Sequence, residues 1–251
     1  MIEHLLGSIL LFVVGTIAAF INVNAGGGSS LTLPTLIFLG LDTATANGTN
    51  RIAILTQTFA SVHAFKKESY SQFKLSWKLS LLTLPGAVIG AFAAVEISDE
   101  IFKKVLAVIM IGIIVMMLLP NSKKILVDNS ENKKLTPLTF IAFILIGFYG
   151  GIVQVGIGFL LMSVLQKMMK FNLIYVNMHK SFIVCVLTVP ALLIFILLGK
   201  VDWYWGISLA LGNTFGGWWA TKISIRKGDK FIKAVLAISI LIIAVKLFGF
   251  F

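Results

Sequence analysis

The chain has 251 residues, of which 58% are hydrophobic and only 12% are charged. Soluble globular domains carry about 25% charged residues, so this composition excludes a soluble domain and predicts an integral membrane protein. The formal net charge of +11 would suit nucleic-acid binding, but the basic residues lie in short loops between apolar runs, as in cytoplasmic loops of membrane proteins. We therefore expect the lipid bilayer, and not nucleic acid, as a partner.

Apolar segments follow one another along the whole chain. A spanning helix needs about 20 mostly apolar residues, and runs of about that length recur. No basic region precedes the first run, so we expect a retained span and not a cleaved signal peptide. The predicted segments are 5–24, 29–41, 44–65, 75–95, 101–119, 136–154, 158–169, 173–198, 201–221 and 230–250.

The stretch "NVNAGGGSSLTLP" interrupts the apolar sequence after the first segment. As a helix, the short segment that follows would cover only about 20 Å of a roughly 30 Å hydrocarbon core, so unwound chain must supply the rest. Unwound backbone at membrane depth has to be buried or line a cavity, and a helix N-terminus facing a cavity suits an anion. We expect Ser29 and Ser30 to cap that helix. The candidate substrate-binding residues here are Asn22, Asn24, Gly26, Gly27, Gly28, Ser29 and Ser30.

Further polar motifs open later segments. "ANGTNR" (46–51) and "NMHKSF" (177–182) begin long apolar segments, and "QVGIGF" is a weaker copy of the glycine-rich break. A cation inside a span is by default a functional candidate; the competing interpretations are snorkelling cations, glycines that pack helices and a structural histidine. The candidates from these motifs are Asn47, Thr49, Asn50, Arg51, Gln154, Gly156, Gly158, His179, Lys180 and Ser181.

The two halves of the chain resemble each other. "GAVIGAFAAVEIS" (86–98) matches "GNTFGGWWATKIS" (212–224), "DEIFKKVLAV" matches "DKFIKAVLAI", and Asn22 and Gly26 align with Gln154 and Gly158. Weak internal symmetry is typical of transporters. It predicts a first repeat (1–119), a cytoplasmic linker (120–135) and a second repeat (136–251). We also expect the GxxxG glycines to lie at helix–helix contacts. The aligned glycine pairs are Gly86/Gly212 and Gly90/Gly216.

The distribution of basic residues predicts the topology. If every segment crosses the membrane and the N-terminus lies outside, the loops 66–78, 120–135, 167–172 and 222–233 face the cytoplasm and hold 15 of the 21 basic residues. Under the positive-inside rule this favours ten spans in two inverted five-segment repeats. The alternative is eight full spans with two re-entrant segments, in which the bias disappears.

In their order and spacing, "GGGSSLTLP", "ANGTN" and the "VDW" of 201–203 resemble the TauE/SafE family of membrane transporters, also called the sulfite exporter family. The resemblance covers nearly the whole chain. It implies transport of a small sulfur-containing anion, such as sulfite or an organosulfonate, driven by an ion gradient in the bacterial cell (inner) membrane. The second half departs from the pattern, because "QVGIGFLLMSVLQ" has fewer glycines and no proline.

These observations predict an all-α, polytopic secondary transporter of a small anion. An anion channel, a transporter of an unrelated solute and a non-transporting scaffold remain as alternatives, and homo-oligomer formation stays open. The sequence shows no paired carboxylates, no metal-ligand spacing and no nucleophile with a base. We therefore expect no enzyme activity, catalytic residue, cofactor or metal.

Overall fold

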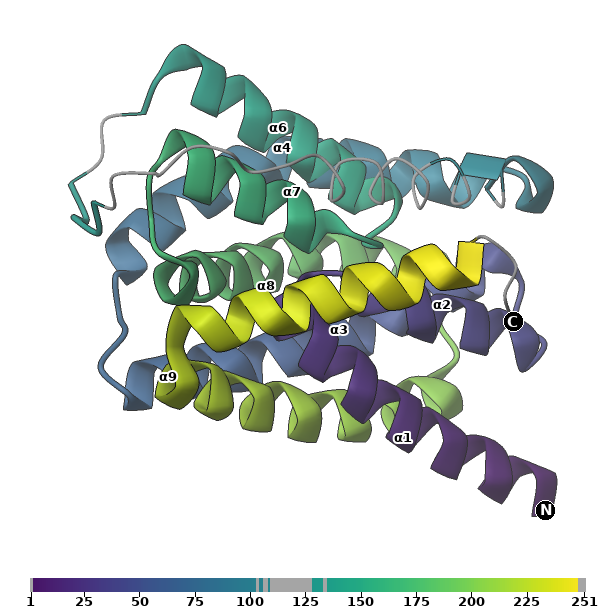
Figure 1. The fold of residues 1–251 in the computed structure, drawn as a ribbon. Helices are drawn as coiled ribbons and strands as arrows, with labels where there is room; N and C mark the ends of the chain where they lie inside the picture. The colour runs from purple at the N-terminus through teal and green to yellow at the C-terminus, as the bar shows by residue number, and fades with distance from the viewer. Residues whose placement is uncertain (1, 103, 106–107, 109–127, 133–134, 248–251) are drawn as a thin grey trace.

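The computed structural model is built from helices, and the part of the chain that it describes contains no strand (Figure 1). The described residues are 2–102, 104–105, 108, 128–132 and 135–247, so most of the predicted segment 101–119 and of the linker 120–135 lies outside them. The helices are α1 (Ile2–Asn24), α2 (Ser29–Phe38), α3 (Thr43–Lys67), α4 (Phe73–Glu96), α6 (Pro137–Ile152), α7 (Ile157–Ser163), the π-helical turn η1 (Val164–Met168), α8 (Leu173–Leu197) and α9 (Trp203–Leu247).

The predicted break after the first helix is present. Residues 25–28 separate α1 from α2, so this part of the prediction is confirmed, although Asn22 to Asn24 still belong to α1. The predicted serine caps are wrong: Gly28 occupies the N-cap with helical φ and ψ, and no side chain caps the helix. Instead, the hydroxyl of Ser30 donates 2.7 Å to the carbonyl of Gly27, because Ser30 already lies within the first helical turn.

The last helix is divided in two. Gly228 has φ 71° and ψ −169°, a conformation that glycine adopts without steric cost, and the chain reverses direction there (Figure 1). The structure thus separates residues 203–227 from 229–247, as the two predicted segments 201–221 and 230–250 require.

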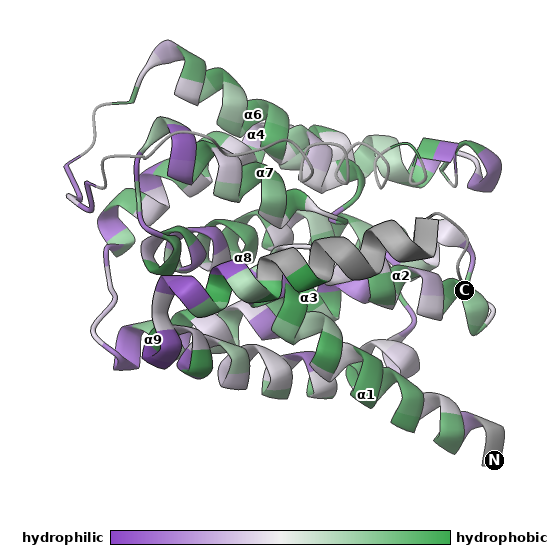
Figure 2. Cartoon of the chain, viewed as in Figure 1, coloured by the Kyte–Doolittle hydropathy of each residue, from purple (hydrophilic) through white to green (hydrophobic). Residues whose placement is uncertain are grey.

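The outer helices present apolar side chains to the surroundings. Leu5, Leu6 and Ile9 of α1 are more than half exposed, and hydrophobic residues predominate along α1 and α6 (Figure 2). In the described part of the chain, the helices long and apolar enough to cross a membrane are His4–Asn24, Phe73–Glu96 and Leu173–Leu197. Exposed apolar surface on this scale is what lipid contact requires.

Glycine contacts join the helices in two equivalent pairs. A Cβ on Gly86 or Gly90 of α4 would overlap the carbonyl oxygens of Ile144 and Phe148 in α6. On α9, a Cβ on Gly212 or Gly216 would overlap the carbonyl oxygens of Phe12 and Thr16 in α1. The prediction that these four glycines lie at close helix–helix contacts is therefore confirmed. The partner residues also correspond, since Phe12 and Ile144 hold the same position in the repeat that aligns Gly15 with Gly147.

Loops rich in basic residues meet at one end of the bundle, on the left in Figure 1. Asn129 connects two of them, because its carbonyl accepts from Gln72 Nε2 at 2.6 Å and its Oδ1 accepts from the amide of Asn172 at 3.1 Å. The amide of Leu173 donates to Asp229 Oδ2 at 3.3 Å. The loops predicted to be cytoplasmic thus share one end, which agrees with the ten-segment topology.

The opposite end repeats one of these contacts. The amide of Thr43, at the start of α3, donates to Asp99 Oδ1 at 3.3 Å, just as that of Leu173, at the start of α8, donates to Asp229. Asp99 and Asp229 are an aligned pair in the sequence repeat. Equivalent residues therefore make the same contact at opposite ends of the molecule.

Candidate functional site

The first break touches the start of α7, just after the second break, at glycines that align in the sequence repeat. Gly26 has φ +92°, and a Cβ there would overlap the backbone of Gly158; a Cβ on Gly158 would overlap Gly26 in return. In the second half the break runs from Val153 to Gly156, whose φ is 74°. Only glycine permits two backbones to approach this closely.

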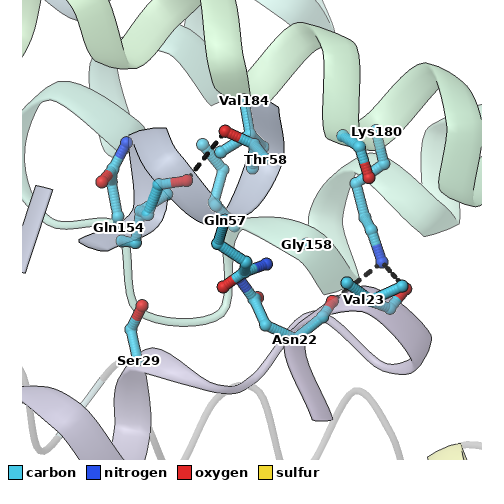
Figure 3. A pocket seen from close by; sticks show the side chains of 12 residues that line it. Asn22, Val23, Ser29, Gln57, Thr58, Gln154, Gly158, Lys180 and Val184 are labelled. Atoms are coloured by element: carbon cyan, nitrogen blue, oxygen red, sulfur yellow. Dashed lines mark hydrogen bonds between the residues drawn. The ribbon is translucent and has the colours of Figure 1, made fainter. Parts of the chain in front are cut away.

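A polar pocket lies beside this crossing of the Gly26 and Gly158 backbones, between α3 and α8 (Figure 3). It is formed by the helix ends that flank the breaks, by Gln154 of the second break, and by one face each of α3 and α8. Its lining combines amides, hydroxyls and one cation with aliphatic side chains: Asn22, Val23, Ser29, Ile54, Gln57, Thr58, Gln154, Ile157, Gly158, Lys180, Ser181 and Val184. The structure thus brings six of the predicted site residues together: Asn22, Ser29, Gln154, Gly158, Lys180 and Ser181.

The pocket is small. Its volume is about 10 Å³, close to the minimum that holds one water molecule. A sulfur oxyanion is larger than a water molecule, so it does not fit unless the surrounding elements move apart. The described conformation is therefore closed around this site.

Lys180 reaches across the pocket to the end of α1. Its Nζ donates to the carbonyls of Asn22 at 3.0 Å and Val23 at 2.7 Å (Figure 3). It also donates to Asn177 Oδ1 at 2.9 Å. The last carbonyls of a helix lack partners within the helix, and a cation beside them is favourable because they form the negative end of the helix dipole. Lys180 therefore caps α1.

Arg51 makes the same kind of contact with another helix, because it donates to the last carbonyls of α6 as Lys180 donates to those of α1. From α3 it donates through Nη1 to the carbonyl of Gly150 at 3.1 Å and through Nη2 to that of Gly151 at 2.5 Å, in the last turn of α6. Its guanidinium also lies 4.7 Å from the ring centroid of Phe195, a cation–π contact. Asn47 Nδ2 adds a bond of 2.7 Å to the carbonyl of Ile152. Arg51 is buried and does not line the pocket.

Several other candidates hold neighbouring helices. Asn24 accepts from Ser224 Oγ at 2.5 Å, and Asn50 accepts from Thr32 Oγ1 at 2.6 Å. The backbone of Gly27, Gly28 and Gly156 belongs to the breaks themselves, and Ser30 lies in the first turn of α2. These residues surround the crossing without lining the pocket, and their role in substrate binding stays a prediction.

Thr49 and His179 each lie seven residues after the N-cap of their helix, Asp42 for α3 and Asn172 for α8. Thr49 Oγ1 accepts from the amide of Asp202 at 2.9 Å, where α9 begins. The ring of His179 is hydrogen-bonded to Ser76 Oγ at 2.8 Å and to Gln72 Oε1 at 3.3 Å, where α4 begins. Both side chains thus join a central helix to the start of a neighbouring helix, which is a structural contact.

Sequence reasoning missed Gln57 and Thr58. Gln57 Oε1 accepts from Asn22 Nδ2 at 3.2 Å, which ties α3 to the end of α1 inside the pocket. The signal was a helical stripe, because Gln57 and Thr58 follow Asn50 and Arg51 by seven residues, two helical turns. Polar residues on one face of a helix in a chain this apolar indicate a polar interior.

The architecture defines the class of protein. Helices with lipid-facing apolar surfaces surround discontinuous helices and a buried polar pocket, an arrangement found in membrane transporters. The chain belongs to the sulfite exporter TauE/SafE family, whose model matches residues 11–247.

Relatives in several bacteria match nearly the full chain. The probable membrane transporter protein ORF9 of Sinorhizobium sp is 29% identical over 247 residues, covering 97% of this chain and 92% of its own. The probable membrane transporter protein YfcA of Escherichia coli K12 is 27% identical, covering 95% and 88%. A probable membrane transporter protein of Haemophilus influenzae is 26% identical, covering 91% and 89%. No solved structure matches the chain.

Proposed function

We propose that this protein is a secondary transporter that moves a small anion, sulfite or an organosulfonate, across the bacterial inner membrane with the energy of a proton gradient. The observation that carries the proposal is the pocket beside the crossing of Gly26 and Gly158. It holds a buried ammonium, Lys180, together with amide and hydroxyl groups. In the described part of the chain no carboxylate pairs with Lys180, so a bound anion would neutralise its charge.

The same proposal includes two inverted five-segment repeats that cross the membrane ten times. It is supported by the equivalent glycine contacts of α1–α9 and α4–α6 and by the mutual contact of Gly26 and Gly158. In transporters built from inverted repeats, the site lies near the membrane midplane and the halves rock around it. A pocket with almost no free volume then represents an occluded conformation between the two open ones.

Substrate binding is tested with purified protein and a panel of sulfite, sulfate, thiosulfate, sulfoacetate and taurine. A ligand at a hundred times its Kd stabilises the folded state by about 2.7 kcal/mol, which a thermal shift detects. We expect at least one sulfur anion to stabilise the protein and the pocket variant Asn22→Ala to reduce the shift. Asn132→Ala, the same substitution at an exposed position outside the pocket, is the matched control.

Transport is tested in proteoliposomes with the anion that binds. Uptake that follows an imposed pH gradient, and accumulates the anion against its own gradient, supports a proton-driven transporter. Flux that only dissipates the anion gradient indicates a channel. Binding without any flux indicates a scaffold, and stabilisation by an unrelated solute alone would replace the sulfur anion as substrate.

Topology is tested by cysteine labelling from either side of the membrane, after Cys185 is replaced by alanine. Ser71→Cys and Ser98→Cys are conservative changes at exposed positions, one just before and one just after α4, and therefore at opposite ends of that helix. We expect an impermeant reagent outside the cell to label Ser98→Cys and to leave Ser71→Cys unlabelled. Adding Lys230→Cys separates the two topologies, since labelling of that position from outside would support eight spans.

A further inference from the structure

The Lys180 ammonium is surrounded by neutral groups. Its three N–H donors are matched by three oxygens, namely the carbonyls of Asn22 and Val23 and the side-chain oxygen of Asn177. Met162 Sδ lies 3.9 Å away. Each donor already has an acceptor, although none of these acceptors carries a charge. An anion that reaches the ammonium must therefore displace one of these oxygens.

Displacement has a mechanical consequence because two of the oxygens belong to the last turn of α1. This turn directly precedes the break at residues 25–28, which runs to the crossing at Gly26. Among the described residues, no backbone amide outside the helices donates a hydrogen bond to the carbonyl of Asn22 or Val23. Lys180 therefore fastens the end of α1 to α8.

An anionic oxygen attracts the Lys180 ammonium more strongly than a carbonyl oxygen does, because it carries a full negative charge and the carbonyl only a partial one. The pocket also has no room for an anion until its walls separate. Binding of the anion and release of α1 thus favour each other.

We infer that Lys180 is both the cation that binds the substrate and the latch that holds α1 in place: the incoming anion draws Nζ away from the carbonyls of Asn22 and Val23, and the freed end of α1 lets the pocket open. This inference rests on the proposed function. Arg51 is the fixed counterpart, because it clamps the end of α6 from outside the pocket. The two buried cations, alike in their carbonyl partners, then have different roles.

The test measures sulfite affinity and hydrogen exchange of the protein in lipid nanodiscs, with Lys180→Gln as the main variant. Glutamine keeps two N–H donors for the carbonyls but carries no charge. We expect its affinity for sulfite to fall at least about tenfold. In the wild-type protein, saturating sulfite should speed amide exchange over residues 20–30 severalfold, and in Lys180→Gln it should not. Lys200→Gln, the same change at a partly exposed lysine 3.7 Å from Asp42, is the matched control.

The outcomes separate this inference from the proposed function. Wild-type sulfite affinity in a folded Lys180→Gln protein would overturn the inference and leave the transporter proposal standing. Sulfite binding that does not speed exchange over residues 20–30 would overturn the latch. If the wild-type protein binds none of the sulfur anions, the proposed function fails.

A second variant tests the latch without any ligand. Lys180→Met, which cannot donate to the carbonyls, should exchange faster than wild type over residues 20–30. Arg51→Met should show the increase over the end of α6 instead. Equal exchange over residues 20–30 in Lys180→Met and the wild type would overturn the latch even if sulfite binds.

Discussion

The helix pairs α1–α9 and α4–α6 are packed through equivalent contacts, whereas the two breaks that they frame carry different side chains. Gly212 meets Phe12 as Gly86 meets Ile144. By contrast, Asn22 aligns with Gln154, and Lys180 stands eight residues after the cap of α8 where Asn50 stands eight residues after the cap of α3. The backbone contacts that are repeated in both halves fix where the chain segments cross. The side chains that differ between the halves make the pocket asymmetric, because its cation comes from the second half alone.

The largest effect is expected where a methyl group is added to the repeated contacts. Gly90→Ala and Gly216→Ala place a Cβ against the backbone carbonyls of Phe148 and Thr16, which cannot move aside as a side chain can. Overpacking of this kind costs about 1–3 kcal/mol or more, so both variants should lose folded yield and thermal stability to a similar extent. The measurement is the melting temperature in detergent and the monodisperse yield.

Gly206→Ala is the control for this pair. On α9, its nearest neighbour would be the flexible end of the Ile52 side chain, so we expect a small change. A fully stable Gly90→Ala alongside an unstable Gly216→Ala would break the equivalence of the two helix pairs.

The next effect distinguishes the two cations. Arg51→Met removes the donors to the carbonyls of Gly150 and Gly151, and hydrogen bonds that involve a charged group contribute about 1.5–3 kcal/mol. We expect a lower free energy of unfolding with anion affinity close to that of the wild type, whereas Lys180→Gln should mainly lose affinity. Denaturant unfolding and anion titration check both quantities. If Arg51→Met keeps its stability and loses anion binding, Arg51 belongs to the substrate site, as the sequence predicted.

The smallest effect concerns the caps of the central helices. Asp42 caps α3 by accepting from the amide of Thr45 at 3.0 Å, and Asn172 caps α8 by accepting from that of Tyr175, also at 3.0 Å. Partial burial acts to raise the pKa of Asp42, but hydrogen bonds from the Thr45 side chain and amide, with Lys200 nearby, lower it below its usual value. Either residue changed to alanine should lose about 1 kcal/mol at pH 7.

The two caps should differ in their pH dependence. Because the folded-state pKa of Asp42 is lowered, its contribution is present above the unfolded-state value of about 3.9 and is lost as the pH falls through the folded-state value. The stability difference between wild type and Asp42→Ala should therefore shrink in acid. The difference for Asn172→Ala should persist, since an amide does not titrate. Melting curves at pH 7 and below pH 4 measure this, and a constant Asp42 difference would argue against the lowered pKa.

The sequence was a good guide to the backbone and a weaker guide to the pocket. Apolar length and GxxxG spacing predicted the helix boundaries, the break after α1 and the close contacts of Gly86, Gly90, Gly212 and Gly216, because these depend on local residue type. The directions of Arg51 and Lys180 were not predictable in the same way. Counted from the caps Asp42 and Asn172, Arg51 corresponds to Ser181, one residue after Lys180, and one residue turns a side chain by about 100° around a helix. Only packing shows which cation faces the pocket.

The contact between Gly26 and Gly158 also bears on how the two halves move. No side chain stands between the two backbones at that point, so there are no interlocking groups to disengage when one half turns against the other. The crossing can therefore act as a pivot, where displacement is least and from which it grows toward both ends of the bundle. A small rotation there would displace the two ends of the bundle far more than the two backbones at the crossing, so opening of the pocket itself would still depend on release of the end of α1 by Lys180.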